Sequence, residues 1–197
     1  MTMRFFALTL LLTTLALAQA PAKKPNTTAK PRTSYFCNQE LGYCFDFPAS
    51  WKMLGQVYEG YGVVVAPTQP GDQDQWAQVT AAAVEIPTQE GKNPPTVDDL
   101  VTSLVGKMAE QAQNMETVRR STETLAHHSA QLLQVHYDEN GKRWGETIVA
   151  MDGGDGMFYT IVYKAQAAEE AKYQPQVEEI LKSFRLAPAE KPENPKP

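Results

Sequence analysis

The three histidines of the chain, His127, His128 and His136, are the first residues to consider as metal ligands. Imidazole nitrogens bind transition metals, and Asp138 follows His136 at a distance of two residues. A site made of His128, His136 and Asp138 is therefore one hypothesis. Adjacent residues of an extended strand point to opposite faces, so His127 and His128 can share one ion only within a turn. We favour histidines exposed to solvent over a metal site.

A second group of candidate ligands lies in the glycine-rich segment 152–156, where Asp152 and Asp155 could offer carboxylates to calcium. The segment lacks the further acidic ligands of an EF-hand loop. Glycine and aspartate are also the residues of an ordinary hairpin turn, which is the interpretation we favour. No lysine and no helix start follow the glycines, so a phosphate loop is not indicated. We therefore predict no cofactor.

Catalysis by a nucleophile finds no support in the sequence, because there is no Gly-x-Ser-x-Gly motif and no serine or threonine with a recognisable histidine partner. We predict no catalytic residue. An enzyme whose site is assembled from scattered residues stays open as an alternative. A pocket in which two or more ionisable groups converge would favour that alternative.

Four aromatic residues are loosely spaced around a predicted loop, and they could line a binding groove: Trp51, Tyr58, Tyr61 and Trp76. Packing in the core or over an edge strand is the more common role of such side chains. We expect the interior of the domain to take up the apolar side chains and to leave no cluster of reactive groups.

Residues 1–20 have the pattern of a cleavable secretory signal. Arg4 precedes an apolar run from Phe5 to Leu17, and Ala18-Gln19-Ala20 is a small-residue cleavage site. The run is shorter than the roughly 20 residues of a transmembrane helix. We therefore expect an exported protein, periplasmic or secreted, without a transmembrane segment after cleavage.

In an oxidising compartment, the only two cysteines, Cys37 and Cys44, are expected to form one disulfide. The polar segment between them ends in Gly42 and can reverse the chain between two short strands. Opposite residues of two such strands are close enough to be joined. The pair lacks the C-x-x-C spacing of redox-active thiols, so a structural role is favoured.

Composition indicates one folded domain between two unstructured ends. With 42% hydrophobic residues the chain can bury a core, and its formal net charge of −5 argues against nucleic-acid partners. Residues 21–34 are rich in proline and lysine, and we expect a disordered spacer there. A single α+β domain is predicted over 35–186, followed by a disordered tail over 187–197.

The order of the predicted elements favours an antiparallel sheet with helices against its faces. Asn140-Gly141 predicts a hairpin. Pro175 is expected to begin or kink the last helix, and residues 67–75 are expected to form an exposed loop. Hydrophobic periodicity predicts strands over 43–47, 51–54, 62–66, 78–86, 115–125, 130–138, 143–151 and 157–164, and helices over 96–113 and 168–183.

Two segments carry a resemblance to a known group. Residues 44–52, CFDFPASWK, resemble the early signature of the PsbP-like superfamily, which includes bacterial DcrB-like proteins, and residues 180–185, ILKSFR, resemble its final helix. The resemblance covers Tyr35 to about Leu186. It implies an α-β-α sandwich that is usually exported and generally lacks catalytic machinery. The cysteine pair and the His127-His128 pair depart from the pattern of the group.

From these observations we expect an exported, non-catalytic domain that binds or stabilises a partner of the cell envelope, in the first place a protein. A small-molecule or metal-binding module is the alternative, and an enzyme with scattered site residues is the third hypothesis. The oligomeric state has no signature in the sequence.

Overall fold

The computed structural model describes residues 32–67, 77–88, 90–154 and 156–187. The predicted leader, the predicted spacer up to residue 31 and the predicted tail from residue 188 lie outside the described residues. The same is true of residues 68–75 of the predicted loop and of Trp76 and Asp155, whereas Pro67, the first residue of that predicted loop, ends a strand. None of the described helices is both long enough and apolar enough to cross a membrane.

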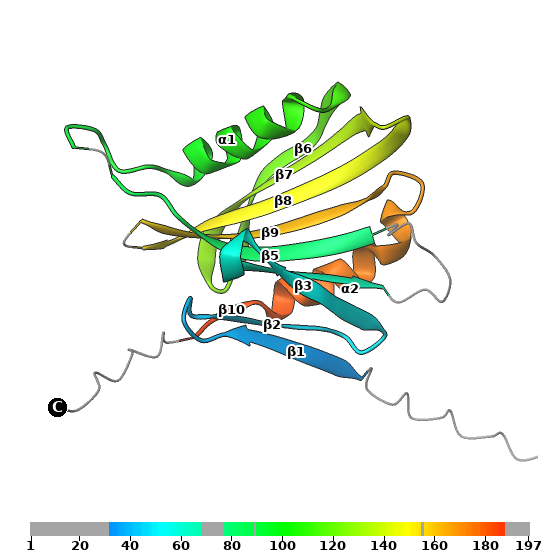
Figure 1. The fold of residues 1–197 in the computed structure, drawn as a ribbon, viewed down its shortest axis with the longest axis horizontal. Coiled ribbons are helices and arrows are strands. Elements are labelled where there is room, and N and C mark those ends of the chain that lie inside the picture. Colours follow the sequence, from blue (N-terminus) through cyan, green and yellow to red (C-terminus); the bar gives the residue numbers. More distant parts are fainter. Residues whose placement is uncertain (1–31, 68–76, 89, 155, 188–197) are drawn as a thin grey trace, which may run out of the picture. The chain divides into compact units, whose positions relative to one another are not determined.

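The largest element is an antiparallel sheet of seven strands in the order β3-β4-β5-β9-β8-β7-β6 (Figure 1). Every pair of neighbouring strands is antiparallel. The last four strands of this sheet in chain order, β6 to β9, form a meander, and β9 then pairs with β5 in the middle of the sheet. The strands are β3 (Trp51–Val57), β4 (Gly62–Pro67), β5 (Ala77–Glu85), β6 (Gln113–Leu125), β7 (His128–Glu139), β8 (Lys142–Gly154) and β9 (Met157–Gln166).

A second sheet of three strands brings the two ends of the domain together. The hairpin of β1 (Thr33–Asn38) and β2 (Tyr43–Pro48) forms its first part. The short strand β10 (Arg185–Leu186) adds to the free side of β2. The first and last strands of the described domain therefore lie on either side of β2.

Two helices lie on opposite faces of the large sheet (Figure 1). Helix α1 (Val97–Ala109) packs Leu100 and Val101 on side chains of β7, β8 and β9. Helix α2 (Glu170–Ser183) lies on the other face, where it shares the main core with β2. A single 3-10 turn, η1 (Tyr58–Gly60), connects β3 and β4.

The two helices flank the sheet only in part. Six strand spacings of about 4.8 Å make a seven-stranded sheet roughly 29 Å wide, whereas a helix with its side chains is about 10 Å across. Helix α1 contacts β7 and β8 and leaves the same face of β5 and of much of β9 without a helix above it. That uncovered strip is where the candidate site lies.

These findings confirm the prediction of an α+β domain built on an antiparallel sheet, and several boundaries differ. Helix α1 ends at Ala109 rather than 113, and Ala112 packs on the same core from the following turn, which extends the apolar period beyond the helix. Strand β1 begins at Thr33, inside the predicted spacer. Of the two alternatives for Pro175, that it begins the last helix is wrong, because α2 starts at Glu170 and contains Pro175, and that it kinks the helix stays a prediction. The small sheet as a separate unit was not predicted.

The hairpins have the backbone that their residues favour. Asn140 and Gly141 both have positive φ, 52° and 73°, as a two-residue turn between twisted strands requires. Ala126 and His127, with φ of 48° and 68°, make the corresponding turn between β6 and β7.

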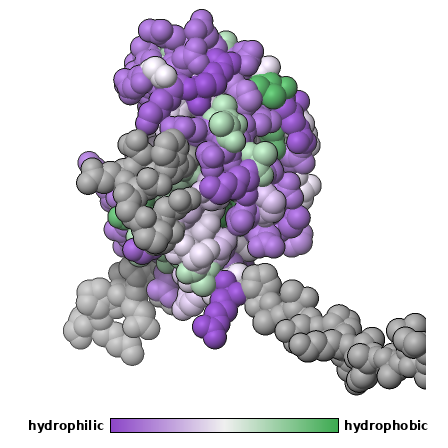
Figure 2. Space-filling model, turned by 90° about the vertical axis from the view of Figure 1, so that its right-hand side faces the viewer, coloured by the Kyte–Doolittle hydropathy of each residue, from purple (hydrophilic) through white to green (hydrophobic). Residues whose placement is uncertain are grey.

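On the side that Figure 2 shows, the described surface is mainly hydrophilic, and hydrophobic residues form small separate areas.

Candidate functional site

A groove lies between α1, η1 and the uncovered strip of the large sheet, and we call it the α1 groove. It consists of two adjoining cavities of about 330 and 650 Å³. Both cavities are lined by Tyr58 from η1, Thr80 from β5, Leu104 and Lys107 from α1, and Val162 from β9. These shared residues make the two cavities one continuous groove.

The larger cavity is the apolar part of the groove. Alternation along β5 directs Ala82 and Val84 to this face, and α1 adds Leu100. On the opposite wall stand Tyr58 and Tyr61, whose exposed fractions are 67% and 42%. Two large aromatic rings are therefore in contact with solvent beside an apolar floor.

The position of the two tyrosines depends on a strained turn. Tyr58 and Glu59 have positive φ, 52° and 55°, which side chains other than glycine rarely adopt. The Tyr61 amide donates to the Tyr58 carbonyl at 3.0 Å, and the Ala83 amide donates to the Tyr61 carbonyl at 2.9 Å. These bonds hold η1 against β5, so the aromatic wall has a defined position.

The smaller cavity is the polar end of the groove, where Tyr137, Glu139, Glu146 and Lys164 converge. Glu146 and Lys164 are direct partners in the pairing of β8 with β9 and therefore lie on the same face. The Tyr137 hydroxyl donates to Glu146 Oε2 at 2.7 Å, and Lys164 Nζ donates to Glu139 Oε2 at 2.7 Å. The ammonium of Lys164 also lies 4.9 Å from the centre of the Trp144 ring.

Burial dominates the electrostatics of this end. Glu146 is only 8% exposed, and burial raises the pKa of its carboxyl, while the Tyr137 hydrogen bond and the charge of Lys164 act in the opposite direction. Burial and the neighbouring Glu146 carboxylate raise the pKa of Tyr137. Tyr137 therefore keeps its proton at physiological pH and remains the donor to Glu146.

The expectation that the fold leaves no cluster of reactive groups is wrong at this place. Leu133, Val135 and Tyr137 alternate along the strand predicted over 130–138, and the three side chains pack on one face of the sheet. No pattern in the sequence placed Glu146 and Lys164 beside them. In the sequence, each of the two is only a charged residue at an inward position of a strand. That they lie side by side follows only when the neighbour of each strand in the sheet is known.

A second polar cluster lies on the opposite face, where α2 begins. Glu170 accepts hydrogen bonds from Gln134 at 2.6 Å and faces His136 Nε2 at 2.9 Å. Gly145 makes room for this carboxylate, since a Cβ there would lie 2.5 Å from Glu170 Oε2. The cluster attaches the first turn of α2 to β7, which is sufficient to explain it structurally.

The structure does not bring the predicted metal ligands together. His136 faces Glu170, whereas Asp138 binds Asn114 and Arg143. His128 lies at the other end of β7, roughly 26 Å away along the strand, and His127 is in the turn before it. Among the described residues, no three or more His, Cys, Asp or Glu side chains form a group that could hold a metal ion.

The other residues predicted as calcium ligands or as groove aromatics do not form one site either. Asp152 accepts a hydrogen bond from the Gly154 amide at 2.8 Å, which is the use of aspartate in an ordinary turn. Trp51 is buried and packs on Tyr173 of α2, with ring centres 6.2 Å apart, so it belongs to the core rather than to a groove. Of the four predicted groove aromatics, Tyr58 and Tyr61 line the α1 groove.

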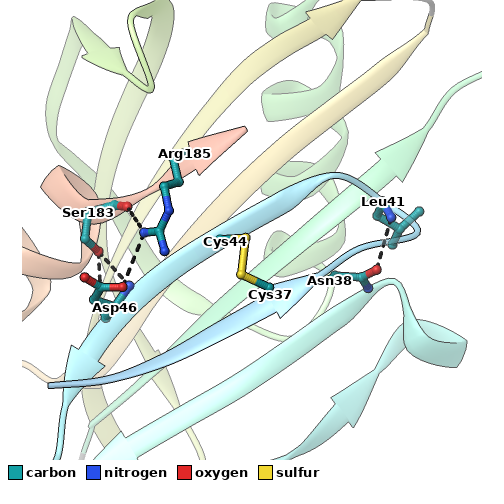
Figure 3. The surroundings of a disulfide bond; sticks show 7 residues. All are labelled: Cys37, Asn38, Leu41, Cys44, Asp46, Ser183 and Arg185. Atoms are coloured by element: carbon teal, nitrogen blue, oxygen red, sulfur yellow. Dashed lines mark hydrogen bonds and ion pairs between the residues drawn. A yellow bond between two sulfur atoms is a disulfide. The ribbon is translucent and has the colours of Figure 1, made fainter. Parts of the chain in front are cut away.

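The predicted disulfide between Cys37 and Cys44 is present and joins β1 to β2 (Figure 3). The two residues are direct partners in the hairpin. Asn38 closes the turn, because its side chain accepts a hydrogen bond from the Leu41 amide at 3.0 Å. The disulfide therefore stabilises the hairpin that carries the aromatic residues of β2.

The closing segment of the domain is tied to the same strand (Figure 3). The Asp46 amide donates to Ser183 Oγ at 2.8 Å, and Arg185 donates to the Asp46 carboxylate at 3.3 Å. Phe184 stacks on Tyr43 with ring centres 5.9 Å apart. The Ser-Phe pair that carried the resemblance therefore attaches the end of α2 to β2.

These features define an α+β domain with one helix on each face of its sheet and a groove beside α1. The sequence model of the PsbP family matches residues 32–186, and the chain belongs to that family. Among curated proteins, no sequence matches this chain.

Solved structures show the same fold at low sequence identity. Cyanobacterial PsbP (CyanoP) from Synechocystis sp. PCC 6803 is similar with a TM-score of 0.55 and 12% identity, over 85% of this chain and 99% of that chain. LpqN of Mycobacterium tuberculosis, described as involved in cell envelope biogenesis, has a TM-score of 0.56 and 16% identity, over 82% and 88%. The Ran-binding protein Mog1p of Saccharomyces cerevisiae has a TM-score of 0.54 and 7% identity, over 80% and 96%.

Proposed function

We propose that this protein is an exported, non-catalytic binding domain that holds a protein partner of the cell envelope in the α1 groove. The observation that carries the proposal is the groove itself, with an apolar floor and two exposed tyrosines on its wall. Each square ångström of apolar surface removed from water contributes about 25 cal/mol, so such a groove favours an apolar occupant. Tyrosine is also enriched in protein interfaces.

Export is supported by the leader pattern of residues 1–20 and by the disulfide, which persists in oxidising compartments. The relatives of known fold agree with a binding role, since one is described as Ran-binding and another as involved in cell envelope biogenesis. These descriptions belong to those proteins, and for this chain they support a hypothesis about its class of function.

Catalysis is the competing hypothesis, because four ionisable groups meet at the polar end of the groove. A buried glutamate with a raised pKa is a suitable general acid. The groups are paired with one another, however, Tyr137 with Glu146 and Lys164 with Glu139. Mutual pairing of this kind is typical of a polar cluster that is satisfied before a ligand arrives, and we therefore favour binding.

The test is affinity capture from the envelope fraction with the mature protein and two arginine variants of α1. Ser103 lines the groove, and Ser103→Arg places a long charged side chain in it. Thr102→Arg makes a similar change at the neighbouring exposed residue. We expect the Ser103 variant to lose a captured protein at least about tenfold, which is about 1.4 kcal/mol of binding free energy, and the Thr102 variant to retain it.

Equal capture of the same protein by the wild type and by both variants would show that the groove is not the binding site. Loss of capture in both variants would indicate damage to α1. Circular dichroism and thermal unfolding of the three proteins separate that result from a specific effect.

A further inference from the structure

We propose that the polar end of the α1 groove is a subsite for the ammonium or guanidinium group of a lysine or arginine side chain of the partner. The inference rests on the proposed function, because it names the chemistry that a protein segment lying along the groove would need at this end. Glu146 is the residue that receives the cation.

The geometry of Glu146 favours a ligand at its carboxylate. The side chain lines the cavity of about 330 Å³ although the residue is only 8% exposed. A carboxylate has about four lone-pair sites, and the Tyr137 hydroxyl occupies one of them at Oε2. A further donor that enters the cavity can therefore bind the same carboxylate without displacing Tyr137.

The charges around the cavity favour a cation over an anion. Lys164 is bonded to Glu139, and its ammonium lies near the rings of Trp144 and Tyr137, at 4.9 and 5.3 Å from their centres. Because Lys164 and Glu139 neutralise each other, Glu146 is the buried charge of the cavity without an ionic partner of its own among the described residues, so an anion would be repelled by its carboxylate, whereas a cation would form a charge-assisted hydrogen bond with it. Lys107 of α1 opposes the cation, but it is exposed and its charge is screened by water.

A side chain that reaches the polar end of the groove must pass along its apolar part. Leu104 and Val162 line both cavities, so the path from the apolar floor to Glu146 is bordered by aliphatic side chains. Lysine and arginine have an aliphatic stem with a charge at its tip, and they bury the stem while the tip makes polar contacts. An aliphatic stem with a charged tip therefore matches a groove that is apolar along its floor and has a carboxylate at its end.

The affinity for a cation should depend on pH in one direction. Burial raises the pKa of Glu146, and a cation binds its ionised form. Affinity therefore falls as the pH is lowered through that pKa and reaches a plateau above it. The charged and titratable groups that line the cavity with Glu146 are Tyr137 and Glu139 of β7, Lys164 of β9, Lys107 of α1 and Tyr58 of η1.

The first experiment uses three small probes with the same chain and different ends: n-hexylammonium, 1-hexanol and hexanoate. Each is titrated into the mature protein while the backbone amides are followed by NMR. We expect n-hexylammonium to bind about tenfold more tightly than 1-hexanol, with hexanoate weakest, and to shift the amides around Glu146 and Lys164. The preference for ammonium should diminish as the pH is lowered, whereas binding of 1-hexanol should not change.

The second experiment compares two variants that remove the same charge. Glu146→Gln keeps the size of the side chain and an acceptor for Tyr137, and should reduce the affinity for n-hexylammonium to that for 1-hexanol. Glu179→Gln, at an exposed residue of α2, should change it less than about twofold. If Glu146→Gln does not fold, the pH dependence of the wild type still tests the subsite.

Three results would overturn the inference: equal binding of n-hexylammonium and 1-hexanol, preference for hexanoate, or full affinity for n-hexylammonium in folded Glu146→Gln. The proposed function would survive them if Ser103→Arg still abolishes capture. A partner that is captured by Glu146→Gln as well as by the wild type would overturn the inference too, because a side chain of that partner would then not occupy the subsite.

Discussion

At Gly145 the absence of a side chain allows α2 and the large sheet to make contact. The residue is paired with His136 on β7, and the carboxylate of Glu170 lies directly over it. Gly145 does not have a positive φ, so glycine is needed here for the space that it leaves and not for its backbone conformation. The role of Glu146 likewise depends on a neighbour, because the hydroxyl of Tyr137 on the adjacent strand donates a hydrogen bond to its carboxylate.

We predict that Gly145→Ala lowers the free energy of unfolding by about 1–3 kcal/mol, because a Cβ at 2.5 Å from Glu170 Oε2 must displace the carboxylate from Gln134 and His136. Gly106→Ala is the matched control. Gly106 lies in α1 with open space around it, and alanine there should stabilise the helix by about 0.5–1 kcal/mol. Urea denaturation measures both changes, and a Gly145→Ala protein as stable as the wild type would contradict the packing argument.

At the scale of elements, the domain is closed by the small sheet. Strand β2 receives β1 on one side and β10 on the other, so it connects the beginning of the domain with its end. Its aromatic residues Tyr43, Phe45 and Phe47 belong to the main core with α2. The hairpin of β1 and β2 is short, and the disulfide between Cys37 and Cys44 restricts it in the unfolded chain as well.

We predict that replacing both cysteines, Cys37→Ser with Cys44→Ser, lowers the free energy of unfolding by about 2–3 kcal/mol, the chain-entropy contribution of a loop of this size. The core residues of β2 remain, so the double variant should still fold. A reducing agent should destabilise the wild type by a similar amount and leave the double variant unchanged. Equal sensitivity of the two proteins to the reducing agent would show that the disulfide is not the cause.

At the scale of the whole molecule, the proposed binding and the proposed export depend on different parts of the chain. The α1 groove arises because one helix covers two of the seven strands of a wide sheet, whereas the export hypothesis depends on residues 1–20, which lie outside the described residues. The two hypotheses can therefore be tested separately.

We predict that the exported protein begins at Pro21, because the leader ends in the small-residue pattern Ala18-Gln19-Ala20. N-terminal sequencing and the intact mass of the exported protein check this. Ala18→Leu enlarges a side chain that the peptidase must accommodate and should leave the leader attached, whereas Ala22→Leu beyond the junction should not. Export of a chain that still contains residues 1–20 in the wild type would contradict the prediction.

Local signals were sufficient for most elements of this fold. Hydrophobic periodicity identified the strand over 130–138, which is β7, and Asn140-Gly141 identified the turn that follows, because both depend on residues that are neighbours in the chain. The cysteine pair identified the first hairpin for the same reason. The end of α1 was predicted less well, since Ala112 continues the apolar period after the helical hydrogen bonds have stopped.

The sequence by itself determined the class of the domain, its antiparallel strands, its disulfide and its resemblance to the PsbP-like superfamily. Only the tertiary structure decided which charged residues meet. Glu139 and Lys164 are 25 residues apart, and they become neighbours because β8 lies between β7 and β9 in the sheet. The same holds for the groove, since the width of a sheet and the place of the single helix on it depend on strand order, which no local pattern of side chains encodes.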